Sequence, residues 1–372
     1  MSEHHTCQGV FMITIEKVFS FEESYPLSKF GDMEQLLFFD IETTGFSGDF
    51  NMVYLIGCVF FQNGTSRFIQ WFAETKDDER AVLESFFGFL EHFRTLVHFN
   101  GDTFDIPFLE KRCRALRLPY GFDRVESIDI FKRIRPYKRY LGLENLKQKS
   151  IESFLGVSRE DVYNGGQLIE IYETYLKTKE QELLHLLLLH NEDDLKGMPK
   201  LLPVLFYPDF FTQDFTLTGM KKAAGETPRL ILSLAGDPKI QIPVPVSASV
   251  PSYAVRAGGD RMLLSIRLYE GTLKYYYPNY KDYYYLVFED TAIHKSVGEY
   301  VDKEARIRAT RETCYTKKQG IFLPQPEPFW KPEFKTSCKE KSCFFEFSPD
   351  CFSDRETLNR YVRRIIKDVF RA

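Results

Sequence analysis

The N-terminal half of the chain alternates short apolar runs with longer amphipathic stretches. The apolar runs have the length and composition of β-strands and cover residues 36–43, 53–62, 66–72 and 96–99. Asn63 and Gly64, which separate two of these runs, are typical of a tight hairpin turn. Further strands are predicted over residues 10–15 and 125–131, and helices over residues 77–93, 104–116, 143–155, 165–176 and 180–202. Strands with interspersed helices indicate an α/β fold in this half.

The pattern changes after Pro203. Short strand-like runs lie among Pro, Gly, Ser and Thr residues and cover residues 230–234, 240–246 and 262–268. Two tyrosine triplets, Tyr275–Tyr277 and Tyr283–Tyr285, flank a polar pentapeptide and predict a hairpin with aromatic faces. Such tyrosines can stack on nucleic-acid bases, but packing across strands is the simpler interpretation.

A helix is predicted over residues 292–310, with a basic end formed by Lys303, Arg306, Arg308 and Arg311. Together these patterns divide the chain into three parts. We expect a lead-in over residues 1–34, an α/β domain over residues 35–207, and a smaller α+β domain over residues 208–372.

Two carboxylates, Asp40 and Glu42, interrupt the first apolar run. Side chains at i and i+2 of a strand share a face, so both carboxylates are expected to project from one side of it. The neighbouring Phe38, Phe39 and Ile41 are too apolar for a strand exposed to solvent. Adjacent carboxylates repel unless a cation lies between them, and hard divalent cations prefer oxygen ligands. The run therefore predicts part of a metal site.

Two acidic stretches downstream extend this hypothesis. The first contains Asp105, which lies in the first turn of the predicted helix, beside the end of a buried strand. The second places His190 and Asp194 four residues apart, on one face of a helix. Asp102 lies close to Asp105, and we interpret it as a helix cap. Asp193 and its neighbour Glu192 point to other faces of the helix and are secondary candidates.

The three motifs together resemble those of the DEDD exonucleases of the ribonuclease H-like superfamily. In that family D-x-E comes first, then an Asp after an Asn, then His or Tyr four residues before a last Asp. Within it, residues 30–205 look most like the bacterial YprB-like group, whose segment before the last motif is similar to residues 155–162 and 172–176. The resemblance implies a mixed five-stranded sheet with flanking helices and a site for two divalent cations, Mg²⁺ or Mn²⁺.

Carried over by position, the resemblance also implies roles for single residues. The metal ligands are Asp40, Glu42, Asp105 and Asp194. His190 is the general base, as in the His subtype of the family, and substrate contacts fall at Thr43, Asn100 and Phe104. The implied activity is hydrolysis of DNA or RNA, mostly one nucleotide at a time from a single-stranded 3′ end.

The densest basic segment of the chain lies between the second and third motifs. It interleaves cations with aromatic rings and contains Lys132, Arg133, Arg135, Tyr137, Lys138 and Arg139. Lys and Arg neutralise backbone phosphates without reading sequence, and aromatic rings stack on unpaired bases. The segment is a candidate substrate-binding surface, and a solvated loop of ordinary basic residues is the alternative.

Bulk composition sets wider limits. The 372 residues carry a formal net charge of −4, so phosphate binding has to come from local patches. Neither a membrane-length apolar run nor a secretory leader is evident, and seven cysteines without a secretion signal predict a reduced, cytoplasmic protein. Cys338 and Cys343 are spaced too widely for the tight pairs of a zinc site, which favours ordinary thiols.

Three functions remain open at this point. The first is a metal-dependent 3′–5′ exonuclease. The second is a nucleic-acid or protein-binding module that keeps the fold without turnover, which the complete set of four carboxylates argues against. The third is a structure-specific endonuclease of the same fold, which would also cleave circular substrates. The sequence predicts no membrane association, and it identifies no protein partner.

Overall fold

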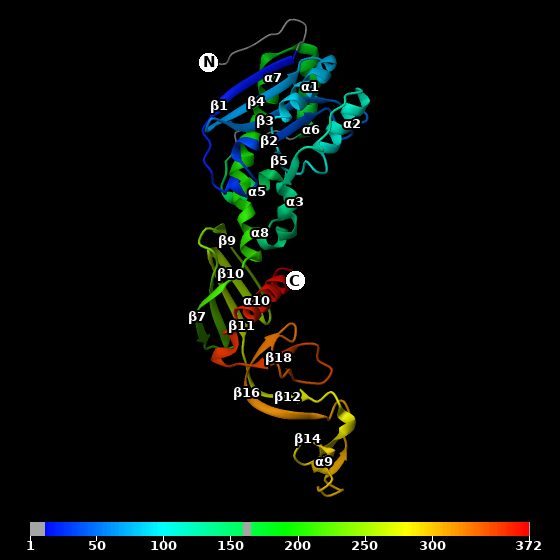
Figure 1. Ribbon diagram of the computed structural model, residues 1–372, viewed down its shortest axis with the longest axis vertical. Helices are drawn as coiled ribbons and strands as arrows, with labels where there is room; N and C mark the ends of the chain where they lie inside the picture. The colour runs from blue at the N-terminus through cyan, green and yellow to red at the C-terminus, as the bar shows by residue number, and fades with distance from the viewer. Residues whose placement is uncertain (1–11, 159–164, 372) are drawn as a thin grey trace. The chain divides into compact units, whose positions relative to one another are not determined.

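The computed structural model describes residues 12–158 and 165–371 (Figure 1). The chain divides into two compact units, Met1–Pro208 and Asp209–Ala372. Each unit has a hydrophobic core cluster of its own. Two earlier predictions fall partly outside the described residues: the start of the strand at 10–15, and residues 159–162 of the segment before the last motif.

The first unit is built on a six-stranded mixed sheet in the order β1-β4-β3-β2-β5-β6. The strands are β1 (Met12–Phe19), β2 (Leu36–Thr43), β3 (Val53–Gln62), β4 (Thr65–Ala73), β5 (Thr95–His98) and β6 (Glu126–Asp129). Neighbours among the first four positions are antiparallel, whereas β2–β5 and β5–β6 are parallel. The sheet has six strands and not the expected five, because β1 of the predicted lead-in joins the edge beside β4.

The helices of this unit are α1 (Glu79–Leu90), α2 (Asp105–Ala115), α3 (Ile130–Ile134), α4 (Lys138–Leu141), α5 (Gln148–Leu155), α6 (Gly165–Thr178) and α7 (Gln181–Leu201). The helix α8 (Phe206–Thr212) begins in this unit and ends in the second. Consecutive residues of β2 show how helices flank the sheet. The ring of Phe39 stacks on Phe86 of α1, whereas Asp40 accepts a hydrogen bond from Asn191 of α7. Because alternate side chains of a strand point to opposite faces, α1 and α7 cover opposite sides of β2.

The second unit is rich in β-strands. A five-stranded antiparallel sheet runs in the order β7-β8-β11-β10-β9. Its strands are β7 (Thr216–Ala223), β8 (Arg229–Ala235), β9 (Ile242–Val250), β10 (Tyr253–Gly259) and β11 (Arg261–Arg267). The amphipathic helix α10 (Arg355–Arg371) packs against β9 and β10. This C-terminal helix was not predicted from the sequence.

Two smaller sheets complete the second unit. A closed barrel consists of β12 (Tyr269–Tyr276), β16 (Tyr315–Gln325), β18 (Cys343–Glu346) and β17 (Phe334–Lys335). A three-stranded sheet consists of β14 (Thr291–His294), β13 (Tyr283–Leu286) and β15 (Arg306–Arg308), with the short helix α9 (Lys295–Gly298) after β14.

Two predictions for this unit were wrong. The tyrosine triplets do not form a hairpin, because β12 pairs with β16 and β17 whereas β13 pairs with β14 and β15. Tyr277 does stack on Tyr283, at 4.6 Å between ring centroids, so local aromatic contact exists without local strand pairing. The helix predicted over 292–310 is reduced to Lys295–Gly298, because residues 291–294 pair with β13 as strand β14. Residues 306–308, near the basic end of the predicted helix, pair with β13 as strand β15.

Within residues 12–158 and 165–371, every helix is too short or too polar to cross a lipid bilayer.

Candidate active site

One cleft of about 460 Å³ brings the predicted motifs together. All five predicted catalytic residues line it: Asp40, Glu42, Asp105, His190 and Asp194. Two of the predicted substrate contacts, Asn100 and Phe104, line it as well. The β2 strand, the start of α2 and the α7 helix supply the acidic side chains. Residues separated by more than a hundred positions in the sequence therefore share one cavity.

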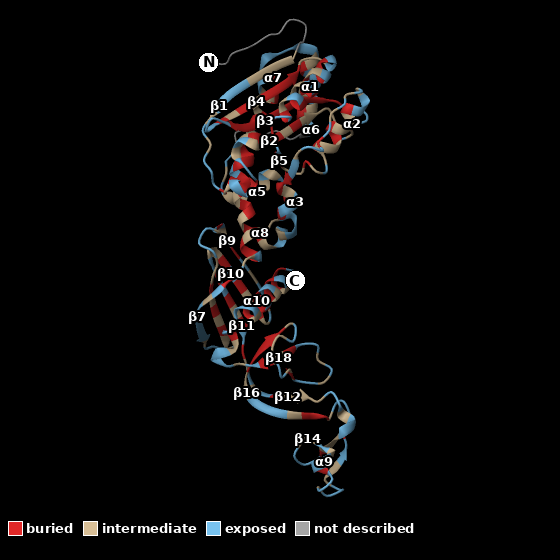
Figure 2. Cartoon of the chain, viewed as in Figure 1, coloured by how far each residue is buried: buried red, intermediate tan, exposed pale blue. Residues whose placement is uncertain are grey.

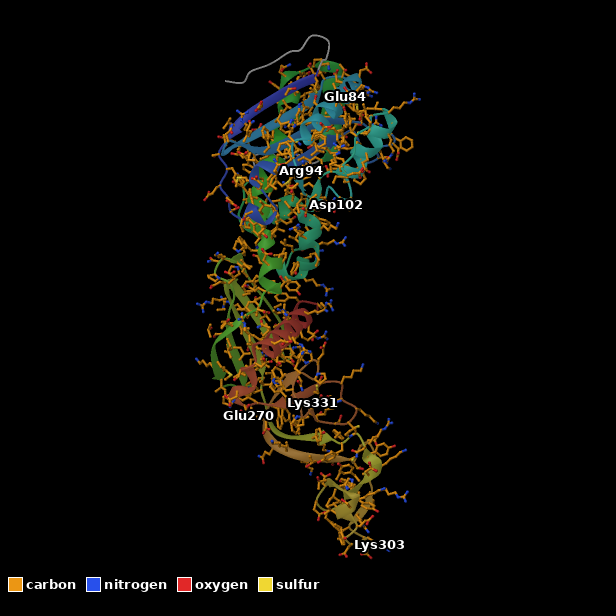
Figure 3. The ribbon with its side chains drawn as sticks, in the orientation of Figure 1. Glu84, Arg94, Asp102, Glu270, Lys303 and Lys331 are labelled. Carbon is orange, nitrogen blue, oxygen red and sulfur yellow. The ribbon has the colours of Figure 1, made fainter. Side chains whose placement is uncertain are left out.

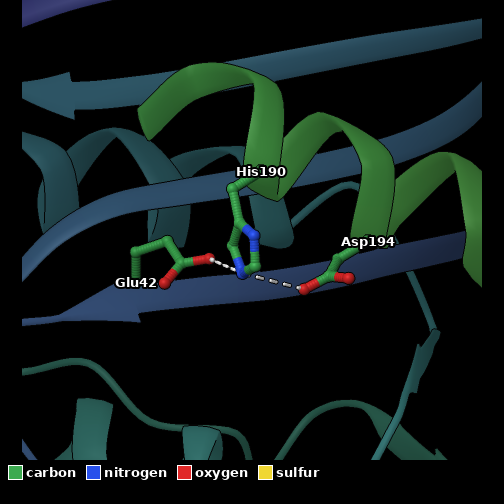
Figure 4. A group of neighbouring side chains, drawn as sticks. All are labelled: Glu42, His190 and Asp194. Carbon is green, nitrogen blue, oxygen red and sulfur yellow. Dashed lines mark ion pairs between the residues drawn. The ribbon is translucent and has the colours of Figure 1, made fainter. Parts of the chain in front are cut away.

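His190 lies between two of the carboxylates. Its Nε2 is 3.4 Å from Asp194 Oδ2 and 3.6 Å from Glu42 Oε1 (Figure 4). The helical spacing of four residues puts His190 and Asp194 on one face of α7, as the sequence predicts. The His190 side chain is only 7% exposed and that of Glu42 12%, so this contact is largely shielded from solvent. A buried acid–imidazole cluster of this kind can bind a cation or hold a proton.

Asp40 is fixed by two residues that the sequence did not reveal. Asn191 Nδ2 donates to Asp40 Oδ2 at 2.9 Å, and Gln70 Nε2 donates to Asn191 Oδ1 at 2.9 Å. Both amides are fully buried, Gln70 on β4 and Asn191 on α7. The chain Gln70–Asn191–Asp40 ties the third motif to the first across three elements. A glutamine within the apolar run at 66–72 was the available signal.

The close approach of α7 to the sheet depends on Gly57 of β3, which lies directly opposite Asp40. A Cβ at Gly57 would lie 2.0 Å from Asn191 Oδ1 and 2.4 Å from Leu195 Cδ1. Gly57→Ala is therefore expected to lower the free energy of unfolding by about 1–3 kcal/mol, the usual cost of overpacking. Urea denaturation followed by circular dichroism measures this change.

Gly88→Ala is the matched control for this prediction. Gly88 lies within α1, and a Cβ there would meet nothing within 4 Å. Alanine is favoured over glycine by about 0.5–1 kcal/mol inside a helix, so the control is expected to be neutral or stabilising. Equal destabilisation by the two substitutions would contradict the proposed packing of α7 on Gly57.

Asp105 is the first residue of α2 and is buried. Burial raises the pKa of its carboxyl from the ordinary 3.8 to about 7, the nearby charge of Asp129 adds to the rise, and backbone hydrogen bonds from Asp105 and Ile41 oppose it. At neutral pH a cation has to displace a proton from this group in a large fraction of molecules, because a ligand carboxyl binds in its ionised form.

This shift has a consequence for stability without metal. Because the folded-state pKa is raised, the contribution of Asp105 is fully present below pH 4 and lost as pH rises toward 7. Relative to Asp105→Asn, the free energy of unfolding of the wild type in EDTA should fall by about 1.4 kcal/mol per pH unit between pH 4 and 7. Above about pH 7 this difference in the free energy of unfolding should level off. Urea titrations at a series of pH values measure the difference, and a pH-independent difference would contradict the burial argument.

The turn before Asp105 is held by a second polar cluster. Asp129 at the end of β6 accepts backbone hydrogen bonds from Asn100 and Lys132, at 3.0 and 3.1 Å from its Oδ1. Asn100 has a φ of 67°, a left-handed conformation that asparagine tolerates better than most residues. His98 lies beside Asp129 and accepts from the Gly101 amide at 3.0 Å. These contacts place Asn100 at the cleft.

The interpretation of Asp102 as a helix cap was wrong. Asp102 lies in the loop between β5 and α2 (Figure 3), and α2 begins after Phe104 without a side-chain cap. Asp102 instead accepts a hydrogen bond from Ser127 Oγ and, at 2.7 Å, one from Lys132 Nζ. It therefore joins the loop of the second motif to β6 and α3.

The basic segment at 132–140 is helical and does not form an extended loop; it covers α3, a 3₁₀ turn at Arg135–Tyr137, and α4. Its five cations, Lys132, Arg133, Arg135, Lys138 and Arg139, are exposed. Phe131 lines the cleft, but the cations after it do not, and neither does Thr43. The sequence also missed Lys147 and Gln148, which line the cleft; Gln148 Nε2 donates to the Asp194 carbonyl at 2.9 Å.

The donor set of the cleft fits hard divalent cations. Ligand atoms of Glu42, His190 and Asp194 all lie within 4.8 Å of one another, and two further carboxylates line the same cavity. Carboxylate oxygens are the ligands that Mg²⁺ and Mn²⁺ take in proteins. A second group, His98, Asp102 and Asp129, is equally close, but its atoms are engaged in the hydrogen bonds of the second-motif loop.

Comparisons with known proteins agree with this fold. Residues 37–205 match the family model of the RNase_H superfamily, as the resemblance of the motifs implied. A curated relative, "Uncharacterized protein YprB" of Bacillus subtilis (strain 168), is 28% identical over 184 residues. The alignment covers 47% of this chain and 43% of that protein, so the chain spans less than half of the relative's length.

Solved structures resemble the chain only weakly overall. The family B DNA polymerase of the archaeon Pyrobaculum calidifontis superposes with a TM-score of 0.37 and 14% identity, covering 64% of this chain and 33% of the polymerase. A zinc-bound complex of E. coli ExoI with single-stranded DNA gives a TM-score of 0.27 and 13% identity, covering 41% of this chain and 42% of that one.

Proposed function

We propose that the protein is a divalent-cation-dependent nuclease that hydrolyses phosphodiester bonds of DNA or RNA, acting as a 3′–5′ exonuclease. One observation carries this proposal: four carboxylates and a histidine from three separate motifs meet in one cleft of a ribonuclease H-like domain. Carboxylates gathered in this way repel one another, and bound cations relieve that repulsion.

Each side chain then has a defined role. Asp40, Glu42, Asp105 and Asp194 would hold two Mg²⁺ or Mn²⁺ ions. Cations bound there would favour ionisation of an attacking water and stabilise the charge on the leaving oxygen. His190, whose Nε2 faces Glu42 and Asp194, accepts the proton of the water as a general base. Asn191 and Gln70 hold Asp40 in position.

The remaining cleft wall suits a nucleic-acid strand. Phe99 and Phe131, with ring centroids 5.8 Å apart, line it together with Phe104. Aromatic faces stack on bases of any sequence, which suits a nuclease without strong base preference. Lys147 lines the cleft as well and supplies a cation for a substrate phosphate. The exposed cations at 132–139 extend this charge outside the cleft.

Degradation of 5′-labelled single-stranded DNA and RNA in Mg²⁺, Mn²⁺ or EDTA tests the proposal. A metal-dependent ladder that shortens from the 3′ end is expected, and the polymer that is degraded identifies the sugar preference. A circular single strand is the matched control, because an exonuclease leaves it intact whereas an endonuclease of the same fold cleaves it. Intact linear substrate in every metal, with binding retained, would favour a binding module and overturn the proposal.

A further inference from the structure

The outward face of the five-stranded sheet in the second unit carries an unusual distribution of charge. Its five strands contain no Asp or Glu, and they contain six basic residues: Lys221, Lys222, Arg229, Arg256, Arg261 and Arg267. The whole chain, in contrast, has a formal net charge of −4. The positive charge of this sheet is therefore a local feature that composition alone does not explain.

Strand register places five of these cations on one face. The buried residues of β8, β10 and β11 alternate with exposed ones, as the banding in Figure 2 shows for the sheet, and the buried side meets α10. Five basic residues lie on the opposite side: Lys221, Arg229, Arg256, Arg261 and Arg267. Lys222 belongs to the other side, where its Nζ lies over the ring of Phe347.

Arg229 and Arg267 stand directly opposite each other on β8 and β11. Like charges in directly opposed positions destabilise a sheet unless an anion lies between them. Buried Arg229 Nη1 also has no hydrogen-bond partner among the described residues. Lys221 adds a third cation next to this pair, because it opposes Ile231, two residues along β8 from Arg229. The three cations form a row across adjacent strands.

Carboxylates do not neutralise this row. Among residues 12–158 and 165–371, no ion pair is formed by Lys221, Arg229, Arg256 or Arg267, whereas Arg261 pairs with Asp260 at 3.5 Å. Glu270 lies in the same pocket as Arg267 without forming such a pair. Ile231, Leu263 and Ser265 lie between the cations on this face. Ser247 and Ser249 lie beyond them on the edge strand β9, opposite Arg256 and Ala254.

We infer that this face, the basic sheet face of Lys221, Arg229, Arg256 and Arg267, binds the phosphate backbone of a nucleic-acid strand. Arg, Lys and Ser side chains are the usual donors to phosphate oxygens. A strand that crosses β7, β8, β11 and β10 meets a cation on each of them. The choice of nucleic acid as the bound polyanion rests on the proposed nuclease function. The inference assigns the second unit the role of holding the substrate.

Binding of labelled oligo-dT and oligo-U, followed by fluorescence anisotropy in EDTA over roughly 50 to 200 mM salt, tests the inference. Replacing all four residues of the basic sheet face with Gln should reduce the slope of log K against log salt by about 3, since each single-strand phosphate contact contributes roughly 0.7. Four exposed cations elsewhere in the unit, Lys303, Arg308, Lys339 and Lys341, provide a control with the same change in charge. Their replacement should leave most of the slope in place.

An unchanged slope in the sheet-face variant would overturn the inference. The inference would also be overturned if the sheet-face variant changed the salt slope of poly-glutamate binding but not that of oligonucleotide binding. The face would then bind an acidic peptide. Cleavage plays no part in these measurements. A chain with an active cleft can therefore fail this test, and a chain that cleaves nothing can pass it, so failure of the inference and failure of the proposed nuclease activity are distinguishable.

A single substitution separates binding from a structural role. Arg267→Gln removes the repulsion with Arg229, so it should leave the melting temperature unchanged or higher while weakening oligonucleotide binding. A lower melting temperature with unchanged binding would show that Arg267 only supports the fold, and it would contradict the inference.

Discussion

Replacing Asp194 with asparagine is expected to lower the rate of phosphodiester cleavage by roughly 10³-fold or more, because a catalytic cation stabilises the transition state by several kcal/mol. Asn keeps the shape of the side chain and removes the charge that faces His190 and the cleft. The same loss is expected for Asp40→Asn. Cleavage of labelled single strands under single-turnover conditions measures the effect, and thermal unfolding checks that the fold is retained.

Asp193→Asn is the matched control for Asp194→Asn. The two residues are adjacent on α7, but Asp193 lines a different pocket, with Glu152, Gly197 and Lys200. The control is expected to keep nearly all activity. Full activity in Asp194→Asn would show that this carboxylate is not part of the metal site. Equal losses in the two variants would show that the total charge of α7 matters and the position of the carboxylate on the helix does not.

Replacing His190 with glutamine is expected to slow cleavage by about 10²–10⁴-fold, the usual contribution of a general base. The substitution removes the group that takes the proton of the water but leaves all four carboxylates in place. Mn²⁺ binding should therefore persist while the rate falls. Comparison of single-turnover rates with Mn²⁺ affinity separates the role of a base from the role of a ligand.

His185→Gln gives the corresponding control, because His185 lies on the same helix and is exposed. It should cleave at the wild-type rate. Loss of Mn²⁺ binding together with activity in His190→Gln would identify His190 as a metal ligand and contradict its assignment as a base. Wild-type cleavage without His190 would contradict any catalytic role for it.

Local patterns predicted the central part of the first unit well. The apolar runs at 36–43 and 53–62 coincide with β2 and β3, and the helix predicted over 180–202 corresponds to α7. These elements are buried, and burial requires apolar residues at regular positions along them. Their apolar patterns are therefore strong enough to be recognised in the sequence. Because the spacing of Asp40 with Glu42, and of His190 with Asp194, is fixed by strand and helix geometry, their shared orientation could also be predicted.

Contacts between distant elements could not be predicted in this way. Asn191 reaches Asp40, and Gln70 reaches Asn191, only because α7 packs on Gly57, and no local pattern encodes that approach. The same limit explains why the tyrosine triplets were wrongly predicted to pair with each other. The strands that contain them pair with strands further along the chain. The edge strand β1 was assigned to a lead-in because it is only partly buried and its apolar pattern is weak.

The number of Mn²⁺ ions bound per chain is the sharpest test of the proposed metal site, because the proposed nuclease needs a cleft that holds cations with Asp40, Glu42, Asp105 and Asp194. Electron paramagnetic resonance of the free ion during a Mn²⁺ titration gives this number without a substrate. We expect two Mn²⁺ ions per wild-type chain and at least one fewer in Asp194→Asn, with no change in Asp193→Asn. Binding of no Mn²⁺ by the wild type, or equal binding by wild type and Asp194→Asn, would contradict the proposed metal site.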